Sequence, residues 1–114
     1  MSDDGEDADG VVAAACLYSL DCSEKIFEKE PDIERIDFIF NVKAKWGGNT
    51  QAVLFSIGRE EFEKVDLKSF RAKVEENYNN MWTIARVVMF GGSFEERLKG
   101  FDRASAVANK ALYR

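Results

Sequence analysis

Two apolar runs separated by a glycine pair constrain the fold of this chain more than any other feature. In the first run, every second residue from Ile36 to Trp46 is apolar, and the residues between them are polar except Ile39. This two-residue period is typical of a half-buried β-strand. Gly47-Gly48 and a second apolar run, residues 51–57, follow directly. The sequence therefore predicts an antiparallel β-hairpin.

The position of the turn predicts the register of this hairpin. A tight turn at Gly48-Asn49 suits the positive φ angles of hairpin turns, and it pairs Phe40 with Ile57. Every large apolar side chain except Ile39 and Leu54 then falls on one face of the hairpin. Because an isolated hairpin is marginally stable in water, we expect helices, or strands of another chain, to cover that face.

Helical periodicity precedes the hairpin and resumes after it. Over residues 10–30 apolar side chains recur at helical spacing, and Pro31 ends this helix because a proline pushes the preceding residue out of the α region. Residues 58–65 are expected to form a short helix or turn. The last helix is expected to begin at Ser93, which forms a capping box with Glu96.

Two interpretations fit the segment between the short helix and the last one. Beginning at Asp66, a good N-cap, apolar residues recur every three or four positions as far as Met89, which favours one long helix. The alternative ends this helix at Asn79-Asn80 and makes residues 81–90 a third strand, because they are rich in β-forming types.

These elements predict an α+β fold in which one antiparallel β-hairpin packs against three main helices. The order is α-β-β-(short α)-α-α, or α-β-β-α-β-α if residues 81–90 form a third strand. Acidic residues within the first nine positions supply the whole net charge of −5. Residues 1–9 are therefore interpreted as an acidic flexible tail, and residues 10–114 as a single domain with no net charge.

The composition predicts a cytoplasmic protein that does not enter a membrane. The N-terminus is acidic where a secretory signal would be basic, and the longest apolar run is far shorter than the roughly 20 residues that a membrane helix needs. Only two cysteines are present, Cys16 and Cys22. Their spacing on one helix places them on different sides, so we expect both to be free thiols.

No residue pattern in the chain predicts catalysis, a metal site or a cofactor. Histidine is absent, which excludes histidine-assisted nucleophiles and histidine-based metal sites. Cys16 lies on the apolar face of the first predicted helix, where a thiol normally packs as a small hydrophobe. The adjacent glutamates at 60–61, 75–76 and 95–96 diverge by about 100° on a helix, so they do not converge on one substrate. We therefore lean against an enzyme.

The remaining features favour a non-enzymatic protein-binding module, such as a small regulator, an inhibitor, an immunity protein or an accessory subunit of a complex. Residues 21–37 are mainly acidic and residues 97–114 mainly basic, a segregation that steers a partner or packs within one molecule. The unpaired strand edge also favours a homodimer. The candidate partner-binding residues are Lys43, Lys45, Trp46 and Asn49 on the hairpin, and Arg97, Lys99 and Arg103 on the last helix.

Two other function classes stay open at this point. The first is a small-ligand binder or small enzyme with a pocket between the hairpin and the long helix, lined by Trp46, Tyr78 and Trp82. The second is a nucleic-acid binder that uses the basic hairpin, Lys43, Lys45 and Arg59, beside Trp46. The neutral domain argues against nucleic acid, because affinity there depends on many phosphate contacts.

Overall fold

The computed structural model describes residues 7–43 and 47–112 of the chain. The elements in chain order are α1 (Ala8–Lys29), β1 (Arg35–Lys43), β2 (Asn49–Gly58), α2 (Arg59–Glu63), α3 (Leu67–Glu76), the 3-10 helix η1 (Tyr78–Thr83), β3 (Ala85–Phe90), α4 (Gly92–Glu95) and α5 (Arg103–Ala108). No helix among these residues is both long enough and apolar enough to cross a membrane.

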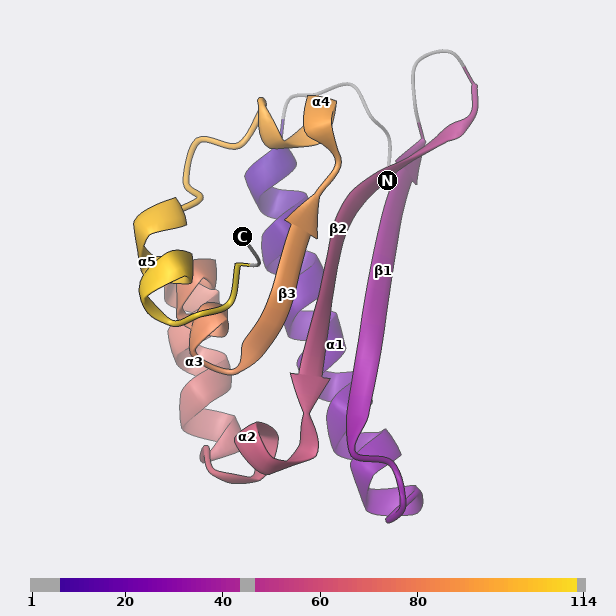
Figure 1. Cartoon of the computed structure of the whole chain (residues 1–114), viewed down its shortest axis with the longest axis vertical. Coiled ribbons are helices and arrows are strands. Elements are labelled where there is room, and N and C mark those ends of the chain that lie inside the picture. The colour runs from indigo at the N-terminus through magenta and orange to yellow at the C-terminus, as the bar shows by residue number, and fades with distance from the viewer. Residues whose placement is uncertain (1–6, 44–46, 113–114) are drawn as a thin grey trace.

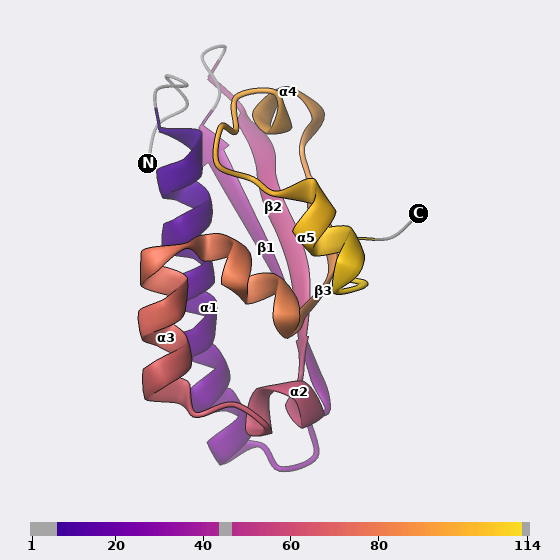
Figure 2. The same ribbon diagram turned by 90° about the vertical axis from the view of Figure 1, so that its left-hand side faces the viewer.

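The three strands form one antiparallel sheet with β2 in the centre, in the order β1-β2-β3 (Figure 1). Helices α1 and α3 lie side by side behind the sheet and cover one of its faces (Figure 2). In front of β1 and β2, no helix of the described chain covers the opposite face. The predicted α+β class is confirmed.

Helix α1 is continuous and begins earlier than the apolar periodicity suggests. Asp7 caps it by accepting a hydrogen bond from the amide of Gly10, and Asp9 lies within its first turn. These two carboxylates therefore belong to an ordered helix start. Cys16 is fully buried on the core face, and both cysteines are free thiols.

The predicted hairpin is present, but its register differs from the prediction. Phe40 pairs with Val53 instead of Ile57, and a bulge after Phe40 leads to a last pair between Lys43 and Asn49. The strands are thus joined by a connection longer than a two-residue turn. As far as Phe40 the displacement is an even number of residues, so the alternation of faces is unchanged there, and Ile39 still points away from the helices.

The single long helix predicted after Asp66 is wrong, and the alternative third strand is correct. Helix α3 ends at Glu76, and the backbone of the C-cap residue Asn77 is extended with φ −155°. The Asn77 side chain then accepts a hydrogen bond from the amide of Asn79 and caps η1, which competes with further α-helix. The chain next enters β3, which pairs with β2.

The single final helix and its capping box are also corrected. Helix α4 begins at Gly92 without a side-chain cap. Helix α5 begins only at Arg103, after the N-cap Asp102, which accepts a hydrogen bond from the amide of Ser105. The connection between them is held by Asn79, which donates to the carbonyl of Gly100 and accepts from the amide of Asp102. The buried side-chain amide of Asn79 thus forms hydrogen bonds in place of those expected within one continuous last helix.

Candidate protein-binding surface

The outer edge of β1 has no pairing partner among the described strands. The amide of Arg59 donates to the carbonyl of Glu34 (2.7 Å), so the backbone at Glu34 points toward β2. Because an antiparallel strand alternates the direction of its polar backbone groups, those of Arg35, Asp37 and Ile39 point outward. This edge therefore offers a regular series of backbone donors and acceptors.

The opposite edge of the sheet is covered. The amide of Val88 on β3 donates to the carbonyl of Ala111 (3.0 Å), and Ala111 is itself buried. The segment after α5 runs beside β3 in Figure 1. Natural sheets protect their edges because an unpaired strand is a template for another strand. The contrast makes β1 the accessible edge of this sheet.

Apolar surface flanks the free edge on both faces of the sheet. On the helix side, a shallow groove of about 180 Å³ runs between α1 and β1 and is lined by Val11, Ala14, Tyr18, Phe40 and Val42, among others. Tyr18 is 60% exposed and packs edge-to-face on Phe40, with ring centroids 6.1 Å apart. On the other side Ile39 is 59% exposed.

On the uncovered face of the sheet, Ile39 belongs to a row of apolar side chains. Ile39 lies opposite Leu54, and Leu54 lies opposite Met89, which is 51% exposed. The neighbouring row is polar, since Asp37 lies opposite Ser56 and Ser56 opposite Arg86. An apolar centre beside a polar margin is the composition of many protein interfaces.

A bulge in β3 brings Arg86 and Met89 onto the same face. Arg86 lies opposite Ser56 and Met89 opposite Leu54, so an extra residue of β3 is accommodated between the two pairs. Val87 has φ 56°, a left-handed conformation that costs a β-branched residue about 1–2 kcal/mol. Local backbone strain at Val87 thus accompanies the formation of this apolar row.

The charged residues of β1 lie toward its two ends. Asp37 forms an ion pair with Arg35 and accepts a hydrogen bond from the hydroxyl of Ser56 (2.5 Å). Lys43 is exposed and forms no ion pair with any residue that the structure describes. Between them, residues 38–42 are uncharged. The middle of the edge is therefore uncharged, and its charged side chains lie toward its two ends.

The structure places the predicted binding residues in two separate regions. Lys43 and Asn49 face each other at the end of the hairpin, and both are exposed. Lys45 and Trp46 lie outside the described residues. The three C-terminal bases Arg97, Lys99 and Arg103 do not share one helix, because the predicted last helix is interrupted.

The C-terminal bases make contacts within the chain. The guanidinium of Arg97 lies over the ring of Phe94, and Arg103 forms an ion pair with Glu95. The amide of Lys99 donates to Asp9. The ion pairs of Asp21 with Arg71 and of Arg103 with Glu95 do not link the acidic and basic segments to each other.

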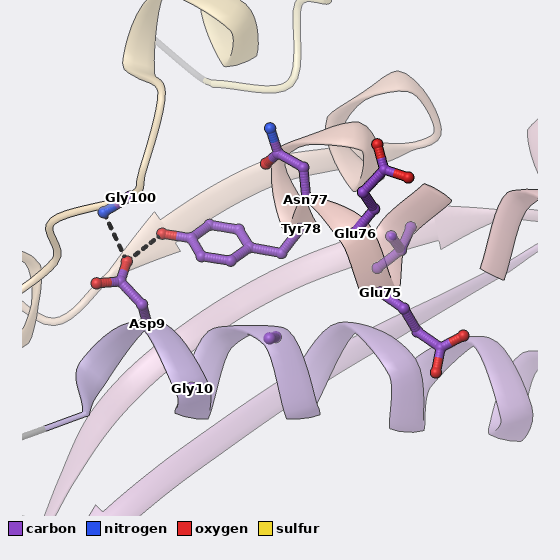
Figure 3. Close-up of a pocket in the computed structure, with 9 residues that line it drawn as sticks. Asp9, Gly10, Glu75, Glu76, Asn77, Tyr78 and Gly100 are labelled. Carbon is purple, nitrogen blue, oxygen red and sulfur yellow. Dashed lines mark hydrogen bonds between the residues drawn. The ribbon is translucent and has the colours of Figure 1, made fainter. Parts of the chain in front are cut away.

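A second surface feature is a shallow depression of about 460 Å³ between the start of α1 and the end of α3 (Figure 3). At its rim, one oxygen of Asp9 accepts hydrogen bonds from the Tyr78 hydroxyl (2.6 Å) and the Gly100 amide (2.8 Å). The other oxygen accepts from the Lys99 amide (2.9 Å). Both carboxylate oxygens thus accept hydrogen bonds, and Asp9 joins the start of α1 to Tyr78 and to residues 99–100.

The electrostatics of this depression fit a structural role. Burial favours the neutral form of Asp9, but the hydrogen bonds from Tyr78, Lys99 and Gly100 outweigh it and lower the pKa. Burial and the bond to Asp9 raise the pKa of Tyr78, so this phenol stays protonated. The carboxylates of Glu75 and Glu76 point in different directions in Figure 3. Neither Asp9 with Tyr78 nor the diverging pair of Glu75 and Glu76 supplies a general base.

The pocket predicted between hairpin and long helix is not formed by the residues expected to line it. Trp82 is fully buried, surrounded by Phe55, Phe90 and Phe101, and its indole N–H donates to Asn79 (2.8 Å). It has no surface to offer a ligand. Tyr78 instead lines the depression on the α1 side, and Trp46 lies outside the described residues.

Other reactive groups are also accounted for by the fold. Burial raises the pKa of the Cys16 thiol, so it is protonated at neutral pH and is a poor nucleophile. Arg59, expected on a basic hairpin surface, instead binds backbone carbonyls of α1 and of the segment that follows it. No group of three acidic or cysteine side chains suited to a metal ion occurs in the part of the chain that the structure describes.

Comparison of the chain with protein-family models, with curated proteins and with solved structures gives no match.

Proposed function

We propose that this protein is a non-enzymatic protein-binding module that accepts an extended segment of another polypeptide chain at the outer edge of β1. The observation that supports this proposal most directly is the contrast between the two sheet edges. The edge of β3 is covered by the segment around Ala111, whereas the nine-residue strand β1 presents outward backbone groups beside apolar side chains.

Backbone hydrogen bonds would supply affinity, and the flanking side chains would supply specificity. Successive side chains of an added strand point to opposite faces of the sheet. One set would enter the groove beside Tyr18 and Phe40, and the other would lie next to Ile39 on the uncovered face. The preferred segment is therefore apolar on both sides over its centre, with charges near its ends.

A proline at position 39 tests the backbone contribution. The amide of Ile39 points outward, so Ile39→Pro removes a donor from the free edge and leaves the bonds to β2 in place. Ile39→Thr is the matched control, because it removes the same apolar side chain and retains the donor.

The experiment is affinity capture from the native cell lysate with the wild-type chain and both variants, followed by mass spectrometry. We expect a stoichiometric protein that survives moderate salt with wild type and Ile39→Thr and is lost with Ile39→Pro. Equal capture by all three chains would refute strand addition at β1. Circular dichroism and thermal unfolding of the free chains show whether each variant is folded.

A further inference from the structure

The distribution of charge along β1 identifies a specific partner for its free edge. A strand that pairs with β1 is favoured when it places an acidic residue opposite Lys43 and a basic residue opposite Asp37, because opposite charges in directly facing positions stabilise a sheet and like charges destabilise it. The same two residues, in reverse order, occur on β1 itself.

We infer that the occupant of the β1 edge is a second copy of this chain, paired antiparallel with Phe40 facing Phe40 of the partner subunit. This inference rests on the proposed binding role of the edge and names the partner. In this register, Asp37 lies opposite Lys43 of the partner subunit, and the two-fold axis repeats the same ion pair at the other end. The interface is then isologous.

The backbone geometry permits this register. The residues with outward-pointing backbone groups are the odd-numbered ones, Arg35, Asp37 and Ile39, and the alternation continues toward Lys43. Two antiparallel copies form hydrogen-bonded pairs when odd-numbered residues face odd-numbered residues. The pairing of residue 37 with residue 43, and of 39 with 41, satisfies this condition, and the two sheets become one continuous sheet.

The neighbouring register is disfavoured by charge. If Ile39 faced Ile39 of the partner subunit, Arg35 would lie opposite Lys43 of that subunit, and this like-charge contact would occur twice. Asp37 would then face Asn41 of the partner subunit, so it would form no ion pair across the interface. Of these two registers, charge therefore favours the one in which Phe40 faces Phe40 of the partner subunit.

The helix layer is compatible with this arrangement. On the flank of α1 nearest the free edge lie Val11, Ala14 and Tyr18, and half-buried Cys22 follows one turn later. None of these residues is charged. The exposed ring of Tyr18 and the groove beside Phe40 would then be covered by the same surface of the partner subunit.

Charge reversal at the two positions, followed by sedimentation velocity across a dilution series, tests the inference. We expect the wild-type chain to sediment at twice its 12.9 kDa mass and to dissociate on dilution. Lys43→Glu converts two attractive contacts into repulsive ones and should weaken the dimer roughly tenfold to a hundredfold. Asp37→Lys should do the same, and the double variant Asp37→Lys/Lys43→Glu should regain most of the lost affinity.

Lys68→Glu is the matched control, because Lys68 is an exposed lysine on α3 and the change in net charge is identical. Its dimer should be unaffected. Lys43 makes no ion pair within the described chain, so Lys43→Glu leaves the fold of the monomer intact and keeps the test informative even if Ile39→Pro fails to fold.

Two results would overturn the inference. One is a wild-type chain that is monomeric at every concentration, and the other is a dimer that Lys43→Glu leaves unchanged. Neither result decides the proposed function, since a monomer that captures a different protein, with capture lost in Ile39→Pro, still uses the β1 edge for binding.

Discussion

The side chain of Arg59 is predicted to contribute more to stability than any other charged group described above. Its guanidinium donates to the carbonyls of Ile33 (2.7 Å), Phe27 (3.1 Å) and Glu30 (2.6 Å), and it lies 4.7 Å from the centre of the Phe27 ring. The side chain is only 14% exposed. Arg59 thus caps the end of α1 and fixes the path into β1.

The expected cost of Arg59→Met follows from these contacts. Each lost hydrogen bond is worth about 1 kcal/mol once water can replace it in part, and the cation–ring contact adds about 0.5–1 kcal/mol. The ion pair with Glu63 adds little, because the Glu63 side chain is mostly exposed. We therefore expect the free energy of unfolding to fall by about 3–4 kcal/mol, a large part of the stability of a typical domain.

Urea unfolding followed by circular dichroism and tryptophan fluorescence measures this change. Arg59→Lys should recover only about 1 kcal/mol, because one ammonium group cannot reach three carbonyls in the fork geometry of a guanidinium. Arg35→Met is the matched control and should cost less than about 0.5 kcal/mol, because Arg35 forms an exposed ion pair. A loss below about 1 kcal/mol for Arg59→Met, or full recovery by lysine, would refute the assignment of stability to the carbonyl contacts.

Three further predictions concern other parts of the fold. The folded state lowers the pKa of Asp9, so the ionised carboxylate stabilises the protein at pH values above the ordinary pKa of 3.8. This stability is lost as the pH falls through the pKa of the folded state. Asp9→Asn should therefore be less stable than wild type at pH 7, with a difference in thermal unfolding that narrows in acid. Cys22 should react with a thiol reagent in the native state, and buried Cys16 only after unfolding, as mass spectrometry of the labelled protein would show. The free energy of unfolding of Val87→Gly should lie within about 1 kcal/mol of the wild-type value, since glycine relieves the positive φ. Val88→Gly should lower this free energy by more than about 2 kcal/mol by opening a cavity. Chemical denaturation compares the two variants.

The sequence predicts those features of the fold that are encoded locally. The alternation in β1 identifies the buried face of the strand. It also shows that Ile39 is an apolar residue on the opposite face, which the structure leaves uncovered. It does not identify the register, because the pairing of Phe40 with Val53 or with Ile57 preserves the same alternation.

Features that depend on contacts between distant residues are not readable in this way. The three- and four-residue spacing that suggested a long helix includes Val88 and Met89, which belong instead to a strand that the chain reaches after Asn77. The break in the last helix depends on the side chain of Asn79, more than twenty positions earlier. Local periodicity contains no information about either contact.

The sequence predicts only part of the surface that is proposed for binding. Lys43 and Asn49 were expected at the hairpin, and the structure places them at its exposed end. The sequence does not identify Tyr18, because a single aromatic residue on a helix resembles a core position. That β1 is the free edge depends on the strand order and on the segment around Ala111, and neither is a property of the β1 sequence.

The hydrogen bonds of Asp9 have a consequence for synthesis of the protein. They join residues 90 and 91 positions apart, so α1 leaves the ribosome long before its amide donors at Lys99 and Gly100 have been made. Closing so long a loop is among the slower steps of folding, because its entropy must be lost before the contact forms. During translation the first turn of α1 is therefore hydrated, and it docks only after residue 100 has emerged.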